Sequence, residues 1–85
     1  MNKWRMFRVT DRKNKSVMIP QEQFDRIYTI ESIKPCRPAI LNATDGEKLI
    51  TSIVNQNMFV DEFLHLRTED KIYYFQTCDD KGDWC

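Results

Sequence analysis

The chain has 85 residues, of which 41% are hydrophobic and 31% charged, a size and composition that fit one small globular domain. Thirteen basic and thirteen acidic side chains give a formal net charge of zero, which argues against a strongly basic nucleic-acid-binding domain and against a strongly acidic mimic. With three prolines and two glycines, the sequence is neither low-complexity nor collagen-like. Basic residues predominate among the charges of residues 1–25, and acidic residues among those of 61–85.

The cysteines and the absence of a long apolar run predict a cytoplasmic protein without a membrane partner. Cys36, Cys78 and Cys85 form a small, odd set, so we expect reduced thiols rather than a disulfide scaffold. No apolar run follows the charged residues at the start of the sequence, as it would in a signal peptide. No segment approaches the roughly 20 apolar residues of a membrane span.

The sequence predicts a hairpin in its first 19 residues. Residues 3–10 mix aromatic, Met and Val side chains with arginines, which is typical of a strand, although their alternation is imperfect. Residues 16–19 predict a second, short strand, and the polar residues 11–15 indicate the loop that joins the two.

A short helix and two further strands are expected next. Pro20 suits the first turn of a helix, and Phe24 and Ile27 follow at helical spacing, which predicts one or two turns over about 20–27. Alternating side chains and the breaks made by Pro35 and Pro38 then predict strands at 28–33 and 39–43.

Residues 45–56 have two interpretations. Asp45-Gly46 is a strong hairpin signal, and the β-branched residues that follow favour a strand. Against this, residues 44–47 fit a capping box, and four apolar residues have the spacing of one helix face. These four are Leu49, Ile50, Ile53 and Val54. Because the adjacent apolar pairs violate strand alternation, we favour a helix over 45–56; a strand there would instead indicate a small all-β barrel.

The rest of the chain predicts a terminal hairpin and a tail. Residues 58–67 read as one strand, and the aromatic and β-branched residues 72–77 as another after a short polar turn. The first of these strands would carry Met58, Val60, Leu64 and Leu66 on one face. The expected fold is α+β and mainly β: a small antiparallel sheet of five or six strands with one or two short helices. It would form a single compact domain over 1–78, followed by a short acidic tail, 79–85.

Residues suited to catalysis or metal binding are few. His65 is the only histidine, so any Ser-His-Asp or Cys-His arrangement would have to use it. Cys78 and Cys85 lack the close spacing of zinc ligands, and two glycines cannot build a glycine-rich phosphate loop. We therefore expect a protein that is not an enzyme and that has no catalytic residues, metal site or cofactor.

Surplus aromatic residues predict a protein-binding module. Tyr73 and Phe75 face opposite to Tyr74 on a strand, so one set is exposed if helices cover only one side of the sheet. Exposed aromatic residues beside Arg and Met are typical of protein interfaces. The expected function is stoichiometric inhibition, modulation or adaptation of a larger protein, as in the small anti-host or anti-defence factors of phage and mobile elements. The expected contacts are Tyr73, Tyr74, Phe75 and Trp84.

The basic amino-terminal hairpin offers an alternative, a nucleic-acid-binding site. Its cationic side chains would neutralise phosphates while its aromatic rings stack on unpaired bases. The opposing interpretation places these rings in the core, because a chain this small needs most of its large aromatic residues there. The residues of the alternative site are Trp4, Arg5, Arg8, Arg12, Lys13 and Lys15.

Overall fold

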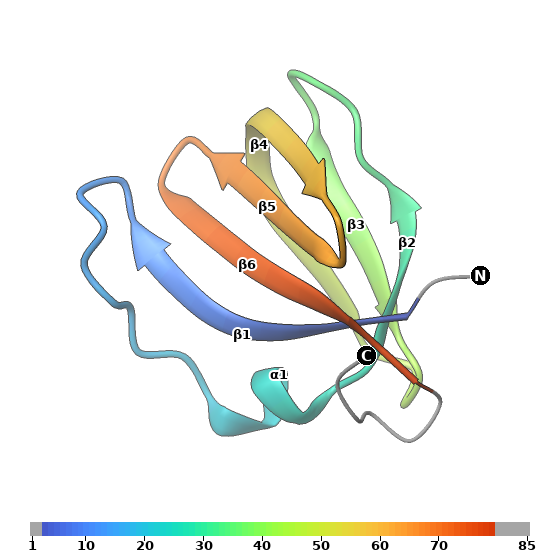
Figure 1. Ribbon diagram of the computed structural model, residues 1–85. Helices are drawn as coiled ribbons and strands as arrows, with labels where there is room; N and C mark the ends of the chain where they lie inside the picture. Colours follow the sequence, from blue (N-terminus) through green and yellow to red (C-terminus); the bar gives the residue numbers. More distant parts are fainter. Residues whose placement is uncertain (1–2, 80–85) are drawn as a thin grey trace.

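The computed structural model describes residues 3–79, which form six antiparallel strands and one short helix (Figure 1). The strands are β1 (Lys3–Asp11), β2 (Tyr28–Ser32), β3 (Pro38–Ala43), β4 (Lys48–Val60), β5 (Phe63–Thr68) and β6 (Lys71–Cys78), and the helix, α1 (Gln21–Asp25), lies between β1 and β2. Each strand pairs with the next, and β6 pairs with β1, so the sheet closes into a small barrel. The mainly β fold predicted from the sequence is confirmed.

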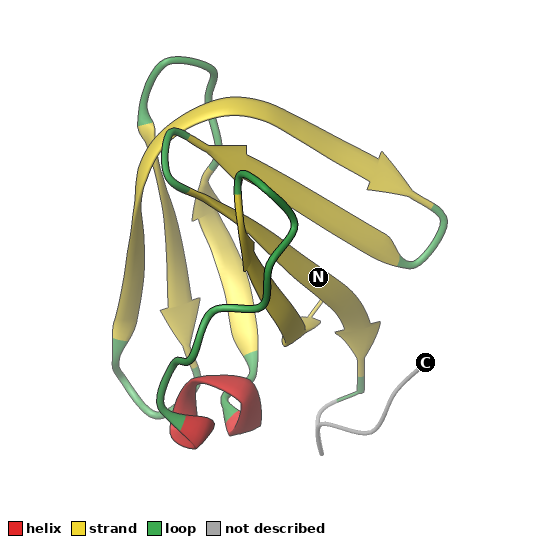
Figure 2. Cartoon of the chain, turned by 90° about the vertical axis from the view of Figure 1, so that its left-hand side faces the viewer, coloured by secondary structure: helices red, strands yellow, loops and turns green. Residues whose placement is uncertain are grey.

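The closed sheet has two parts that share the long strand β4, which bends between them (Figure 2). Its first half pairs with β3 and its second half with β5. Strand β1 pairs with β6 along its whole length, whereas its register with β2 is the single pair Trp4 and Tyr28. Both of these side chains are buried, so the seam that closes the barrel lies over the core.

The core is built mainly from β-strand side chains. Phe75 is fully buried, and its ring meets that of Tyr28 edge-on with 6.0 Å between the centroids. The Tyr28 hydroxyl donates a hydrogen bond to the carbonyl of Gln23 in α1, at 3.2 Å. The helix buries none of its residues completely, but Phe24 packs against the core from outside. The helix therefore covers the seam end of the barrel, and the sheet supplies most of the buried surface.

A β-bulge in β1 changes which side chains point inward. Trp4 and Met6 are buried, as alternation requires, but the register with β6 then shifts between Met6 and Arg8. The extra residue is Phe7, so Phe7 and Arg8 are both exposed and Val9 is buried again. The imperfect alternation of residues 3–10 is the sequence mark of this bulge.

Residues 45–56 do not form the predicted helix. Asp45 and Gly46 form a turn instead, with Gly46 at φ 96, a conformation that glycine adopts at low cost. The Asp45 carboxylate accepts the backbone N–H of Glu47 at 3.1 Å and pairs with Arg26 at 3.0 Å. The hairpin signal of Asp45-Gly46 was therefore the correct one, and β4 follows directly.

A second bulge explains why β4 resembles a helix in sequence. The register of β3 with β4 shifts between the pairs Ile40–Ile50 and Pro38–Ile53. One extra residue on β4 therefore leaves Ile50 and Ile53, three positions apart, both exposed, while Val54 is buried. This spacing imitates one face of a helix, which is why the prediction of a helix was wrong.

Residues 58–67 form two strands rather than the predicted single strand. The turn between them is Asp61-Glu62, where Asp61 has a left-handed backbone with φ 52, and Val60 pairs directly with Phe63 across it. A two-residue turn reverses which alternate positions face the core. The exposed pair is Met58 and Val60, and the buried pair is Leu64 and Leu66.

Of the remaining predicted elements, only the strand at 16–19 is wrong. Residues 16–19 are not a strand: Ser16 forms an isolated bridge with Thr10, and the Val17 N–H donates to the Val9 carbonyl at 3.0 Å. The predicted short helix near 20–27 and the other predicted strands are present. The tail beyond residue 79, with Trp84 and Cys85, lies outside the described residues. No helix in the described part of the chain is long and apolar enough to cross a membrane.

Two buried threonines should respond in opposite ways to the same substitution. The hydroxyl of Thr10 is buried without a hydrogen-bond partner, so Thr10→Val should raise the free energy of unfolding by up to about 1 kcal/mol. The hydroxyl of Thr68 accepts the Lys71 N–H at 3.1 Å and lies 2.9 Å from the Lys71 carbonyl. Thr68→Val should therefore lower the free energy of unfolding by about 1–2 kcal/mol. Urea denaturation measures both, and equal losses would contradict the assignment of the two hydroxyls.

Candidate functional site

Four neighbouring strands direct a regular grid of side chains to the outer side of the barrel, where all are at least partly exposed except Thr10 and Ile72, which are buried. The cross-strand pairs of β4, β5, β6 and β1 line up in rows, each with one residue from each strand. The rows are Val60–Phe63–Gln76–Arg5, Met58–His65–Tyr74–Arg8 and Gln56–Arg67–Ile72–Thr10. We call these residues, with Phe7 from the bulge, the arginine–aromatic face.

Tyr74 lies at the centre of this face and contacts a neighbour on each side. The His65 ring meets the Tyr74 ring at 4.7 Å between centroids, and the Arg8 guanidinium lies 5.5 Å from the same ring centroid. The Phe7 ring lies 6.1 Å from Tyr74 and 6.1 Å from Phe63. These contacts hold Tyr74 in place, and the Arg8 position is that of a cation–π interaction.

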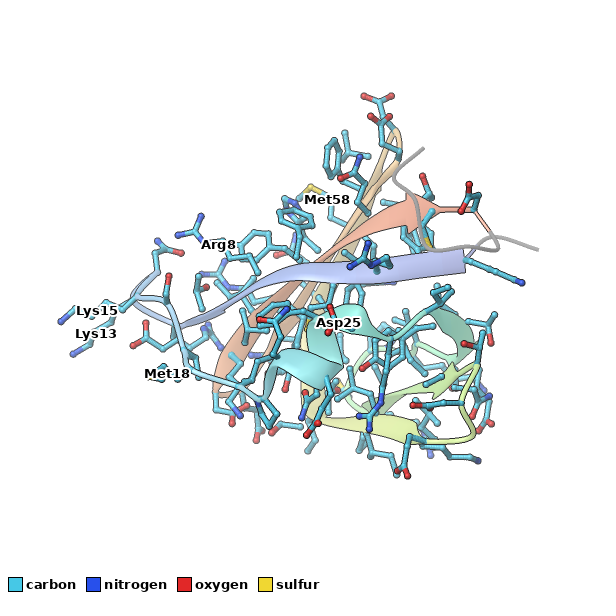
Figure 3. All side chains as sticks on the ribbon, turned by 90° about the horizontal axis from the view of Figure 1, so that it is seen from below. Arg8, Lys13, Lys15, Met18, Asp25 and Met58 are labelled. Atoms are coloured by element: carbon cyan, nitrogen blue, oxygen red, sulfur yellow. The ribbon has the colours of Figure 1, made fainter. Side chains whose placement is uncertain are left out.

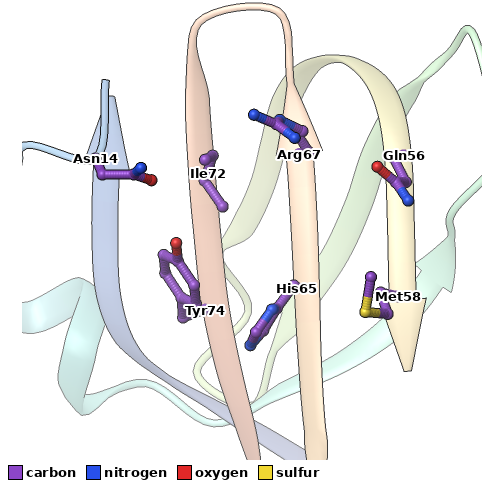
Figure 4. Close-up of a pocket in the computed structure, with 7 residues that line it drawn as sticks. All are labelled: Asn14, Gln56, Met58, His65, Arg67, Ile72 and Tyr74. Atoms are coloured by element: carbon purple, nitrogen blue, oxygen red, sulfur yellow. The ribbon is translucent and has the colours of Figure 1, made fainter. Parts of the chain in front are cut away.

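A shallow groove of about 290 Å³ crosses the face (Figure 4). Met58, His65 and Tyr74 line one end of it, and Gln56, Arg67 and Ile72 line the other. Asn14, from the loop after β1, completes the lining. The groove therefore combines ring surfaces and a thioether with amide and guanidinium donors.

The charges of the grid are all of one sign. Arg5, Arg8 and Arg67 are its only charged residues, and it contains no Lys, Asp or Glu. Arg5 is engaged within the protein, because it donates to the Phe24 carbonyl at 3.3 Å and lies 3.9 Å from Asp25. Arg8 and Arg67 are exposed: Arg8 lies beside Tyr74 on β1, and Arg67 follows His65 on β5.

A structured loop flanks one end of the face. The Asp11 carboxylate accepts the backbone N–H groups of Lys13 and Lys15, at 2.8 and 3.0 Å. The hydrogen bond from the Lys15 N–H is the main reason why the pKa of Asp11 lies below its ordinary value. Arg12 donates to the Thr68 carbonyl at 2.8 Å, which ties the loop to the β5–β6 turn. Lys13 and Lys15 lie at the loop tip, and Arg8 lies on the same side of the sheet as Met58 (Figure 3).

The structure separates the residues that were predicted to contact a protein partner. Tyr73 and Phe75 are 7% and 0% exposed and belong to the core, so they offer no contact surface in the folded protein. Tyr74 is half-buried and faces outward. Trp84 lies outside the described residues.

The alternative nucleic-acid site is divided in a similar way. Trp4 is 3% exposed, in the core, and cannot stack on a base. Arg5 and Arg12 bond to backbone carbonyls. The exposed members of the predicted set are Arg8, Arg12, Lys13 and Lys15, and of these Arg12 is tied to the Thr68 carbonyl.

Sequence reasoning assigned only Arg5, Arg8 and Tyr74 of this face to a binding site. The residues that it missed include Met58, Phe63, His65 and Arg67. The two-residue turn Asp61-Glu62 is the signal for three of them, because it sets the register of β5 and turns Phe63, His65 and Arg67 outward together.

The described cysteines and carboxylates do not gather into a metal site. Within residues 3–79, no group of three His, Cys, Asp or Glu side chains is close enough to hold a metal ion. Cys36 is exposed and Cys78 is buried. Comparison of the chain with protein-family models, curated proteins and solved structures finds no match. What the arginine–aromatic face binds is therefore inferred from its own chemistry.

The loop contact of Asp11 predicts a specific acid response. Because its folded-state pKa is lowered, the stabilisation from this carboxylate is present at neutral pH and is lost as the pH falls through that pKa. In an NMR titration the amide protons of Lys13 and Lys15 should shift together, with a midpoint below the ordinary value of an aspartate side chain. Independent midpoints for these two amides, or a shared midpoint above that value, would contradict the Asp11 contact.

Proposed function

We propose that this chain is a non-catalytic protein-binding module that holds a larger protein on its arginine–aromatic face. It would act stoichiometrically, as an inhibitor, modulator or adaptor, by covering a surface of its partner. The observation that carries the proposal is the composition of the face, which has arginine, aromatic residues and methionine but no lysine or carboxylate. Protein interfaces are enriched in the first group and depleted in the second.

The exposed apolar area supports the same proposal. Phe7, Met58 and Val60 are 41%, 45% and 49% exposed, although a small domain has little apolar surface to bury and each of these side chains would stabilise its core. Phe7 lies on β1 and Met58 and Val60 lie on β4, the two outer strands of the face, and Tyr74 and Phe63 lie between them, so the apolar surface is grouped rather than scattered. Grouped apolar side chains with a polar rim are typical of interaction sites.

The geometry also favours a rigid anchor. Tyr74 is held between His65, Arg8 and Phe7, so little side-chain freedom is lost when a partner covers it. Central aromatic and arginine residues in such positions supply most of the binding energy in measured interfaces.

The two exposed arginines define the chemistry of the partner. Arg8 and Arg67 lie on either side of the central rings and have no carboxylate within the grid. A complementary partner surface is apolar at its centre, to cover Tyr74 and Met58, and has carboxylates placed to meet the arginines.

A second candidate function, binding of single-stranded nucleic acid, is favoured by one observation. Lys13 and Lys15 lie in the loop whose Asn14 lines the same groove as Tyr74 and His65. Rings for base stacking thus lie beside cations for phosphates. This candidate is weaker than the first, because the net charge of the chain is zero and Trp4 is buried in the core.

Variants of the face should distinguish a partner bound specifically through the face from proteins retained nonspecifically. Purified wild-type protein and variants are used as bait in extract of the organism that encodes the chain. A protein retained in a 1:1 complex by wild type should be lost with Tyr74→Ala and with Arg8→Glu, each weakening binding at least 10-fold. The matched controls are Ile50→Ala and Lys48→Glu, on the other half of the barrel, and they should retain it. Equal retention by all variants would contradict the proposal.

Labelled oligonucleotides test the second candidate directly. Fluorescence anisotropy at low salt with a 20-nucleotide single-stranded DNA and RNA should show no binding by the wild-type protein. Salt-sensitive binding that Lys13→Glu and Arg8→Glu abolish would instead establish nucleic acid as the ligand of this face.

A further inference from the structure

The second half of β4 is an open edge of the sheet. Residues 56–60 pair with β5 on one side, Asn55 is the extra residue of a register shift, and among residues 3–79 no strand pairs with the other side of 55–60 (Figure 2). Met58, Phe59 and Val60 are 45%, 53% and 49% exposed. These three consecutive side chains alternate between the two faces of the strand, so the exposure belongs to the edge and not to one face.

The backbone groups that face this open edge follow from the neighbouring ladder. The Thr77 N–H donates to the Glu62 carbonyl at 2.9 Å, so Glu62, Leu64 and Leu66 direct their backbone groups toward β6. The alternate residues of β5 therefore direct theirs toward β4, where they bond Val60, Met58 and Gln56. The intervening residues of β4, Asn57 and Phe59, direct their N–H and C=O groups away from β5, to the open side.

The described part of the chain protects the other edges of the sheet but not this one. The Val17 N–H bonds the Val9 carbonyl, and the Asp11 N–H bonds the Lys15 carbonyl, so the loop after β1 covers the outer edge of that strand. Strand β2 is five residues long and carries Glu31. Residues 55–60, Asn-Gln-Asn-Met-Phe-Val, contain neither a charge nor a proline, the usual devices against edge pairing.

The two ends of the open edge carry opposite charges. At one end is the acidic turn Asp61-Glu62. At the other end the Val54 N–H donates to the Arg37 carbonyl at 2.9 Å, and the Cys36 N–H donates to the Val54 carbonyl at 3.0 Å. This segment closes the edge at Val54 and places the exposed Arg37 there.

We propose that two copies of the chain pair through this edge as a symmetric antiparallel dimer. Met58 would lie opposite Met58 of the second copy at the two-fold axis, and Asn57 and Phe59 would exchange backbone hydrogen bonds with Phe59 and Asn57 of that copy. This register keeps exposed side chains on the same side of both strands. It also brings the acidic turn of each copy to Arg37 of the other, so the charges at both ends are complementary.

The dimer extends the sheet and leaves the arginine–aromatic face open. A two-fold axis perpendicular to the sheet puts both faces on the same side, joined at the Met58 pair. The row from Arg8 through Tyr74 and His65 to Met58 then continues into the second copy, over about 30–35 Å for eight strands. The dimer stands independently of what the face binds.

Sedimentation velocity across a concentration series measures the dimer. So short an edge buries less than a standard interface, so we expect a dissociation constant of about 10–500 µM. Asn57→Pro removes an N–H from the open side only, and it should leave a folded monomer. Arg37→Glu and Glu62→Lys should each weaken dimerisation at least 5-fold, and the double variant should restore it, whereas Lys48→Glu should have no effect.

The contrary results are distinct from a failure of the binding face. A monomer at all concentrations up to about 1 mM would overturn the dimer. A dimer that persists with Asn57→Pro and is not rescued by the Arg37→Glu/Glu62→Lys pair would overturn the edge as its interface. Because neither variant touches Tyr74 or Arg8, loss of the dimer with unchanged capture of a partner leaves the proposed function standing.

Discussion

The bulge at Phe7 is the constraint on which the binding face depends. Strict alternation after Trp4 and Met6 would direct Arg8 into an apolar core, where an unpaired guanidinium is strongly unfavourable. The extra residue resolves this conflict, because Val9 returns to the core and Arg8 turns outward onto Tyr74. It also leaves Phe7 on the outer surface, against both Tyr74 and Phe63. One backbone irregularity thus supplies a cation and a ring to the same site.

Strand β4 links the core, the face and the open edge. Its first half completes the β2–β3 part of the barrel, and its second half carries Met58 and Val60 out to the border of the face. Within residues 3–79, the bend that allows this leaves residues 55–60 with a neighbouring strand on one side only. The exposed side chains that suit a partner and the exposed backbone that suits a second copy therefore have a common origin, the division of one long strand between two parts of the sheet.

The sequence predicts the elements of this fold better than it predicts which of their side chains point into the core. The aromatic strand at 72–77 and the helix after Pro20 follow from composition and from proline chemistry, and both are present. Whether a residue points in or out depends on bulges and turns, and these leave weak traces: Phe7 and Ile50 are ordinary strand residues. The prediction of the contact residues was affected most. Tyr73 and Phe75 were assigned with Tyr74, and only the observed register separates the buried pair from the exposed ring.

Site-specific photo-crosslinking tests the central claim, that the arginine–aromatic face is the surface that meets a larger protein. A benzophenone side chain replaces Phe7, an exposed ring on the face, or Ile50, a still more exposed side chain on the other half of the barrel. Irradiation in extract should join one partner protein to the variant at position 7 and none at position 50. Crosslinks from position 50 with none from position 7 would contradict the account.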